Sequence, residues 1–258
     1  MSDSDQEIRA KAAAYYDLTP PPFDDLPFYR GHIRSPKVSI LELGCGTGRA
    51  LVPLAEHCDQ IYGIDISSAM LDRCRAKIQN AGIQDKAHVA QEDITRISLH
   101  QRFDLIIAPN RVMQRLVTDE QVDRMLSCIG FHLRRDGICI LNAANPEADR
   151  QTLLDAWVNS AAVMLWQKDT QAGKVKHFER RSHIQPDPLV LYPELIYRLN
   201  RPDDTYDQIT VRVAARCWYS DQFVNLIRNH GFRILNSWGG YSSQKYGEGP
   251  ELVVAFTG

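Results

Sequence analysis

The chain has 258 residues, of which 44% are hydrophobic and 24% are charged, and its formal net charge is −2. This length and composition indicate one large α/β domain with an elaboration, or two small domains, and they exclude disorder of the whole chain. The near-neutral charge disfavours a nucleic-acid partner, because there is no excess of positive charge to hold a phosphate backbone.

The N-terminal segment and the cysteines predict a cytoplasmic protein without a membrane partner. Residues 1–17 are polar and acidic and lack the apolar core of a secretory signal. No stretch approaches the ~18 apolar residues that a membrane-spanning helix needs. The cysteines form no C-x-x-C pair, so we expect free thiols and no metal site; they lie at positions 45, 58, 74, 128, 139 and 217.

The apolar residues alternate between periods of 3.6 and 2, which predicts alternating helices and strands. In chain order we predict a helix at 5–17, a proline-rich connector at 18–27 and a helix at 27–34. A strand at 38–43, a helix at 49–57 and a strand at 60–65 follow. The next elements are a helix that Ser67 caps, that runs to Asn80 and that Gly82 ends, and strands at 87–91 and 103–108. A helix at 119–133, a turn at Asp136-Gly137, a strand at 137–143 and a helix at 147–161 follow. This order predicts a doubly wound α/β fold with a parallel sheet.

The pattern then changes to strands over residues 162–219, with turns at 171–173 and 202–204. We interpret this segment as an antiparallel β insertion. A helix at 220–230 capped by Ser220, and strands at 232–237 and 251–256, return to the α/β core.

A glycine-rich turn joins the first predicted strand to the next helix, in the segment ILELGCGTGR of residues 40–49. Glycines permit close approach of a ligand to the backbone, and the start of a helix offers free N–H groups. A dinucleotide-binding fold also begins this way, with the pattern G-x-G-x-x-G/A. Here the glycines are 44, 46 and 48, position 49 is Arg, and Glu42 stands at the end of the strand. This spacing favours a ligand that has an amino group and no pyrophosphate, such as S-adenosylmethionine (SAM).

Two further carboxylates follow the next two predicted strands. Asp65 ends the second strand, where an acidic residue can accept hydrogen bonds from both ribose hydroxyls, and Asp93 follows the third. The carboxyl ends of parallel strands share one edge of the sheet, which is where ligands bind in open α/β sheets. We therefore expect these carboxylates and Glu42 to lie around one ligand.

The segments ILELGCGTGR, GIDISSAMLDRCRAK, QEDI and FDLIIAPNRVMQRL resemble successive motifs of the class I SAM-dependent methyltransferases. The resemblance implies a seven-stranded Rossmann-like sheet whose final strand is antiparallel. The strand-rich insertion is similar, more loosely, to that of small-molecule N-methyltransferases. We expect N-terminal helices or a lid at 1–36, a SAM-binding core at 37–146 and 220–258, and an insertion at 147–219 that contacts the substrate, closes as a lid or forms a dimer.

The resemblance implies that the glycine loop holds the methionine part of SAM, Asp65 the ribose and Asp93 the adenine amine, with Ile66 and Met70 beside the adenine. The predicted cofactor site is Glu42, Gly44, Cys45, Gly46, Gly48, Arg49, Asp65, Ile66, Met70, Asp93, Ile94 and Asn110. Aromatic and polar residues near the predicted site are candidates for substrate contact: Tyr15, Tyr16, Arg111, Gln114, Tyr192, Trp218, Trp238 and Tyr241. No residue is assigned as a catalytic base.

The function expected from these observations is methyl transfer from SAM to a nitrogen, oxygen or sulfur nucleophile of a small molecule, with S-adenosylhomocysteine as the product. Two alternatives stay open: an RNA, DNA or protein methyltransferase, and a SAM-binding regulator without catalysis. The exposed strands of the insertion also allow a homodimer.

Overall fold

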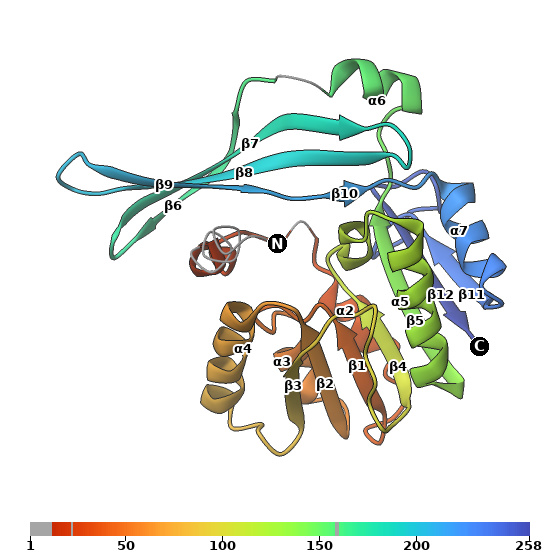
Figure 1. Ribbon diagram of the computed structural model, residues 1–258. Helices are drawn as coiled ribbons and strands as arrows, with labels where there is room; N and C mark the ends of the chain where they lie inside the picture. Colours follow the sequence, from red (N-terminus) through yellow and green to blue (C-terminus); the bar gives the residue numbers. More distant parts are fainter. Residues whose placement is uncertain (1–11, 22, 158–159) are drawn as a thin grey trace. The chain divides into compact units, whose positions relative to one another are not determined.

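The computed structural model describes residues 12–21, 23–157 and 160–258, and it divides into two compact units. The core unit consists of residues 22–147 and 217–258, and the insertion unit of residues 1–21 and 148–216. Each unit contains its own β-sheet (Figure 1). The predicted helix at 5–17 lies partly outside the described residues, which are helical over 12–16. The lid role expected for residues 1–36 stays a prediction.

Sheet A of the core unit has seven strands in the order β11-β12-β5-β4-β1-β2-β3. Their bounds are β1 Ser39–Leu43, β2 Gln60–Asp65, β3 Ala87–Gln91, β4 Phe103–Ala108, β5 Leu133–Ala144, β11 Arg233–Trp238 and β12 Glu251–Thr257. Strand β12 is antiparallel to both β5 and β11, whereas the pairings among β1 to β5 are parallel. The predicted fold class is therefore confirmed. The strand order reverses at β1 and β4, so the carboxyl ends of these two strands flank the position where ligands bind in such sheets.

Helices cover both faces of sheet A (Figure 1). Their bounds are α2 Leu26–Gly31, α3 Leu51–Ala55, α4 Ser68–Ala81, the 3-10 helix η1 Val112–Arg115, α5 Asp119–His132 and α7 Ser220–Asn229. Alternate residues of a strand point to opposite faces. Leu41 and Leu43 of β1 accordingly pack in one buried cluster with residues of α5 and α7, while Ile40 packs in a second with residues of α3 and α4.

The predicted ends of α4 are confirmed, and two other local predictions are wrong. The Ser67 hydroxyl accepts from the Met70 N–H, and Gly82 ends α4 with φ of +66°. The N-cap position of α7 is Tyr219 and not Ser220, and the Tyr219 backbone N–H donates to Gln222 Oε1 at 3.0 Å. There is no turn at Asp136-Gly137: β5 begins at Leu133, and a register shift against β4 absorbs these residues as an irregularity within the strand.

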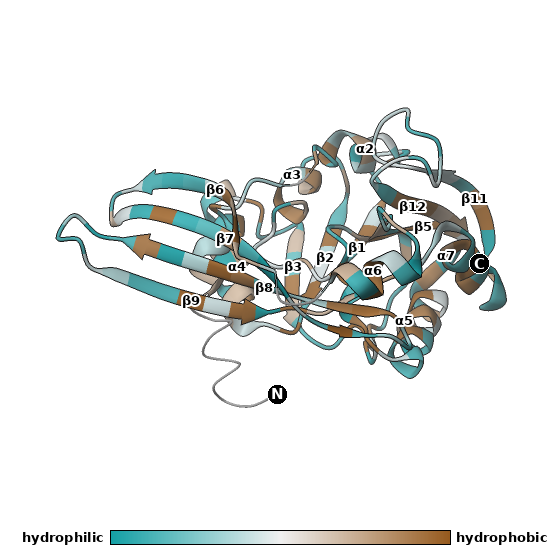
Figure 2. Cartoon of the chain, turned by 90° about the horizontal axis from the view of Figure 1, so that it is seen from above, coloured by the Kyte–Doolittle hydropathy of each residue, from teal (hydrophilic) through white to brown (hydrophobic). Residues whose placement is uncertain are grey.

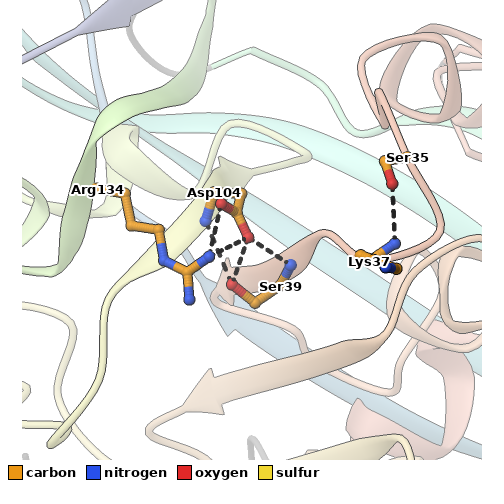
Figure 3. Close-up of polar contacts among 5 residues, drawn as sticks. All are labelled: Ser35, Lys37, Ser39, Asp104 and Arg134. Atoms are coloured by element: carbon orange, nitrogen blue, oxygen red, sulfur yellow. Dashed lines mark hydrogen bonds and ion pairs between the residues drawn. The ribbon is translucent and has the colours of Figure 1, made fainter.

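A polar cluster joins three strands at the amino edge of the parallel sheet, away from the carboxyl ends where ligands bind (Figure 3). The Asp104 carboxylate accepts from the backbone N–H and the hydroxyl of Ser39, both at 2.8 Å, and from Arg134 Nη1 at 2.8 Å. Burial raises the pKa of Asp104, but these donors more than offset it and hold the pKa below its usual value. Asp104 therefore has a structural role.

Sheet B of the insertion unit has five antiparallel strands, in the order β10-β8-β7-β6 with β9 paired to β8. The unit contains α6 Arg150–Ala156, β6 Val163–Thr170, β7 Gly173–Gln185, β8 Val190–Asn200, β9 Tyr206–Arg212 and β10 Ala215–Arg216. The predicted turns lie between β6 and β7 and between β8 and β9. Among the described residues, no helix is long and apolar enough to cross a membrane.

One face of sheet B carries a stack of aromatic rings. Tyr15 stacks on Tyr197 at 5.5 Å between ring centroids, Tyr197 on His177 at 4.5 Å, and His177 on Trp166 at 5.3 Å. His177 is buried, and burial lowers the pKa of its imidazole. Hydrophobic and hydrophilic residues alternate along β7 to β9 (Figure 2). Because successive side chains of a strand point to opposite faces, the face of sheet B without the ring stack is more polar.

Candidate cofactor and acceptor site

The glycine loop after β1 uses the left-handed backbone conformation three times. Gly44, Gly46 and Gly48 have φ of +69°, +55° and +79°. A Cβ atom at Gly44 would lie 2.6 Å from Val112 Cγ2, and one at Gly48 would lie 2.6 Å from Cys74 Sγ, so both positions exclude a side chain. A Cβ at Gly46 would meet nothing within 4 Å. Neighbouring side chains therefore require two of the glycines, while the third leaves open space beside the loop that suits a ligand.

Glu42 lies at the end of β1, is only 3% exposed, and its Oε2 atom has no hydrogen-bond partner. Burial raises the pKa of its carboxyl well above the usual value, and the nearby Arg49 partly opposes this rise. A buried acceptor without a partner is costly, at about 1–3 kcal/mol. The ammonium group of SAM would supply the missing donor, so this residue fits the predicted cofactor.

Asp65 fixes the conformation of the same loop from the end of β2. Its carboxylate accepts from the Gly46 N–H at 2.9 Å and from the Ser67 N–H at 2.8 Å. Burial raises its pKa, and these backbone donors oppose the rise. Each carboxylate oxygen can accept a second hydrogen bond, so Asp65 can hold the loop and still accept from ribose hydroxyls.

The residues predicted to surround adenine show a mixture of exposed and anchored side chains. Ile66 is 55% exposed, which leaves an apolar surface beside Asp65, whereas Met70 is half-buried and Ile94 packs against the core. Asp93 accepts from the N–H and hydroxyl of Thr95 and from the Arg96 guanidinium. Although burial raises its pKa, these donors hold the pKa below its usual value, so the group stays ionised as an acceptor.

A strained turn follows β4, on the other side of the point where the strand order reverses. Asn110 and Arg111 have φ of +57° and +60°, which is uncommon for residues other than glycine. The Arg111 N–H donates to Asn142 Oδ1 at 3.1 Å, and its side chain forms an ion pair with the fully buried Glu251. Asn142 Nδ2 donates to the other carboxylate oxygen of Glu251 at 2.6 Å. Strain of this kind persists where surrounding contacts hold it, and often at functional sites.

Two arginine–carboxylate pairs meet around one cavity at this edge of the sheet. Arg49 donates to both carboxylate oxygens of Asp25, at 2.5 and 2.7 Å. Arg111 pairs with Glu251 and its guanidinium lies 5.6 Å from the centroid of the Phe23 ring. The residues that line the cavity are Phe23, Asp25, Arg49, Asn110, Arg111, Asn142, Tyr241 and Glu251.

Four of these lining residues were absent from the sequence prediction: Phe23, Asp25, Asn142 and Glu251. The available signal was weak, because Phe23 and Asp25 lie in the proline-rich connector and Asn142 and Glu251 read as ordinary strand residues. Glu251 is nevertheless a charged residue at the start of a strand of seven buried residues. A charged side chain in a buried strand needs a buried partner of opposite charge. The charge of Glu251 is therefore the one feature among these four residues that points to a site.

The candidate substrate residues lie in different places. Gln114 is buried and its Oε1 accepts from the Ala144 N–H, and Trp218 is buried beside Phe223, so both have structural contacts. Tyr241 and Trp238 both pack against Phe28 of α2, and Tyr241 also lines the cavity.

Three further candidates, Tyr15, Tyr16 and Tyr192, belong to the insertion unit. Tyr15 lies in the ring stack with Tyr197, and Tyr192 lies against His183. The substrate roles of all these residues stay predictions.

The methyltransferase domain family matches residues 40–137, which contain the glycine loop and the carboxylates Glu42, Asp65 and Asp93. Carboxy-S-adenosyl-L-methionine synthase of Aliivibrio salmonicida (strain LFI1238) is 27% identical over 170 residues, or 62% of this chain and 66% of that protein. Phosphatidylethanolamine N-methyltransferase of Cereibacter sphaeroides is 32% identical over 38% of this chain and 49% of its own length. The chain thus spans about half to two thirds of the length of these curated relatives.

Solved structures share the fold over nearly the whole chain. A SAM-dependent methyltransferase from Clostridium acetobutylicum ATCC 824 superposes with a TM-score of 0.76 and 15% identity, covering 97% of this chain and 98% of that one. An amino pentose methyltransferase from Micromonospora echinaspora, solved with SAM bound, gives 0.70 and 16%, covering 96% and 95%. With the strand order of sheet A, these findings show that residues 40–137 match a methyltransferase domain and that the chain has the fold of SAM-dependent methyltransferases.

Proposed function

We propose that the protein transfers a methyl group from SAM to a nitrogen, oxygen or sulfur nucleophile of a small molecule by direct displacement. The observation that carries this proposal is the unpartnered Oε2 atom of Glu42, buried beside the glycine loop. An ammonium group is the donor that this carboxylate lacks, and the amino acid end of SAM carries one.

The residues of the core unit divide the cofactor between them. Glu42 and the open space beside Gly46 hold the amino acid end, and Asp65 accepts from the ribose hydroxyls. Asp93 accepts from the adenine amine, and the exposed Ile66 contacts the adenine ring. When bound, the sulfonium supplies an already activated methyl group. The protein then contributes mainly alignment and exclusion of water, and alignment alone can contribute about 7–11 kcal/mol.

We propose that the methyl acceptor binds beside Asn110, against the residues that line the small cavity there. Two ion pairs line this cavity, Arg49–Asp25 and Arg111–Glu251. Each pair is neutral overall, which suits an uncharged nucleophile. Burial and the nearby Glu251 raise the pKa of the Tyr241 phenol, so Tyr241 stays protonated and offers a hydrogen-bond donor. A neutral amine can attack without a base, whereas a hydroxyl needs one.

The similarity in fold to an amino pentose methyltransferase supports a small-molecule acceptor and places amines first in a screen. We further propose that residues 147–219 contact the acceptor or a second copy of the chain. The six free cysteines support a reducing, cytoplasmic location.

A calorimetric titration tests the cofactor first. We expect SAM and S-adenosylhomocysteine to bind and NADH to give no heat; binding of NADH alone would refute the assignment of the glycine loop. Amines, hydroxyl compounds and thiols are then incubated with SAM, and the gain of a methyl group is measured by mass spectrometry. SAM binding without transfer to any acceptor would favour a non-catalytic regulator.

A further inference from the structure

The polar face of sheet B gathers positive charge that is spread along the sequence. Residues directly opposite in antiparallel strands share a face, as do alternate residues of one strand. Lys176 pairs in register with Arg198, and Arg180 with Glu194, which pairs in turn with Arg212. We name this surface the basic face; its charged residues are Asp169, Lys174, Lys176, Arg180, Glu194, Arg198 and Arg212.

The charge of the basic face is opposite to that of the chain as a whole. Five cations against two carboxylates leave a formal charge of +3 on this face. Because the whole chain carries −2, the remaining residues carry −5. A compact anion is therefore attracted to this face, whereas the net negative charge of the whole chain disfavours a long polyanion such as RNA.

A buried carboxylate holds two of the arginines in place. Arg180 donates to Oε2 of Glu194 through Nε and Nη2, and Arg212 Nη2 donates to Oε1 at 2.9 Å. The Glu194 side chain is 8% exposed, while those of Arg180 and Arg212 are 48% and 62% exposed. The two guanidiniums, with five N–H donors each, keep donors that Glu194 does not use. Such preorganised pairs are the usual partners of phosphate groups.

The third arginine is held by an amide and two rings. Arg198 donates to Gln208 Oε1 from Nε at 3.1 Å and from Nη2 at 2.9 Å. Its guanidinium lies 5.5 Å from the centroid of the Phe178 ring and 4.9 Å from that of Tyr206. Tyr206 is 57% exposed and offers a ring face on which a nucleobase can stack. Arg198 lies four residues from Glu194 along β8, or about 13 Å at the usual rise of a strand.

We propose that the basic face binds a nucleoside diphosphate group, with the phosphates at Arg180 and Arg212 and the base at Tyr206 and Arg198. The face offers two anchor points separated along one strand, one for anions and one for a flat ring. A nucleoside diphosphate carries both of these groups, whereas a ligand with a single carboxylate carries only an anion.

The test is calorimetric titration of the full-length protein with uridine diphosphate, with inorganic pyrophosphate and with a single-stranded oligouridine RNA, all without SAM. We expect uridine diphosphate to bind more tightly than pyrophosphate, and added salt to weaken both. The double variant Arg198→Gln/Arg212→Gln should lose at least about tenfold in affinity for uridine diphosphate. The matched control is Arg124→Gln, which removes an exposed arginine from α5 in the core unit and should leave the affinity unchanged.

Three outcomes would overturn the proposal: no binding of uridine diphosphate, an equal loss in the Arg124 variant, or tighter binding of the RNA than of the nucleotide. Melting temperatures of the variants show whether each is folded. A parallel SAM titration separates the two proposals. If the wild type does not bind SAM, the proposed function is contradicted. If it binds SAM but not uridine diphosphate, only the role of the basic face is contradicted.

Discussion

Replacing Glu42 by glutamine should stabilise the free protein and weaken its binding of SAM. The carboxyl group is buried, its Oε2 atom has no partner, and burial raises its pKa well above the usual value. Ionising such a group in the folded state costs free energy that an uncharged amide of the same size does not require. In the complex, by contrast, the ionised carboxylate is the proposed partner of an ammonium group.

The sign of the pH dependence follows from the raised pKa. An unfolded glutamate titrates near pH 4.3, at about the model-peptide value. As the pH rises from there through the raised pKa of the folded state, the wild-type protein loses stability, because the folded chain resists ionisation. Each unit of upward shift corresponds to about 1.4 kcal/mol. Glu42→Gln escapes this loss, so its advantage in the free energy of unfolding should grow with pH across that window and then level off.

The effect on SAM has the opposite sign. A hydrogen bond between charged groups contributes about 1.5–3 kcal/mol, so the variant should bind SAM about tenfold to 150-fold more weakly. SAM affinity of the wild type should also increase with pH through the raised pKa of Glu42, and this dependence should disappear in the variant.

Thermal and urea unfolding between pH 4.5 and 8, with calorimetric SAM titrations in the same buffers, measure both effects. Asp104→Asn is the matched control, because it makes the same chemical change at the amino edge of the sheet (Figure 3). A variant that is less stable than the wild type at neutral pH, or that binds SAM with wild-type affinity, would refute the reasoning.

Three further predictions concern the loop and the control site. Asp65→Ala leaves the Gly46 and Ser67 N–H groups without their acceptor and should reduce stability by about 1–3 kcal/mol, while SAM binding weakens strongly in calorimetry. At Gly46 there is space for a methyl group but φ is left-handed, so Gly46→Ala should lower the free energy of unfolding by about 1–2 kcal/mol and weaken SAM binding in calorimetry. Its comparison variant is Gly63→Ala, whose Cβ would lie 2.4 Å from a Leu51 methyl carbon. Gly63→Ala should lower the melting temperature while the folded protein keeps its SAM affinity. Asp104 has a lowered pKa, so its contribution to stability is present above about pH 3.9 and is lost as the pH falls through the lowered value; Asp104→Asn should remove this acid dependence in urea unfolding and leave SAM affinity unchanged.

Much of the core unit follows from local sequence pattern. The bounds predicted for β2, β3 and β4 coincide with those of the structure, and the apolar run 105–108 of β4 is typical of a buried parallel strand. Ser67 and Gly82 mark the ends of α4 for equally local reasons. The Asp136-Gly137 turn was wrong because Leu133 and Ile138, on either side of these residues, both pair with β4, and the residues between them stay in β5 as an irregularity.

The sequence by itself also determined the glycine loop and the order of Glu42, Asp65 and Asp93, since each belongs to a short segment in which a strand ends. Only the tertiary structure decided which distant residues complete the site: Arg111 meets Glu251 across 140 residues, and Arg49 meets Asp25 through a connector without regular pattern. The basic face of sheet B likewise depends on the register of β7, β8 and β9, which places charges from three strands side by side. Pairing partners and register are set by packing across the whole chain, so no local pattern encodes them.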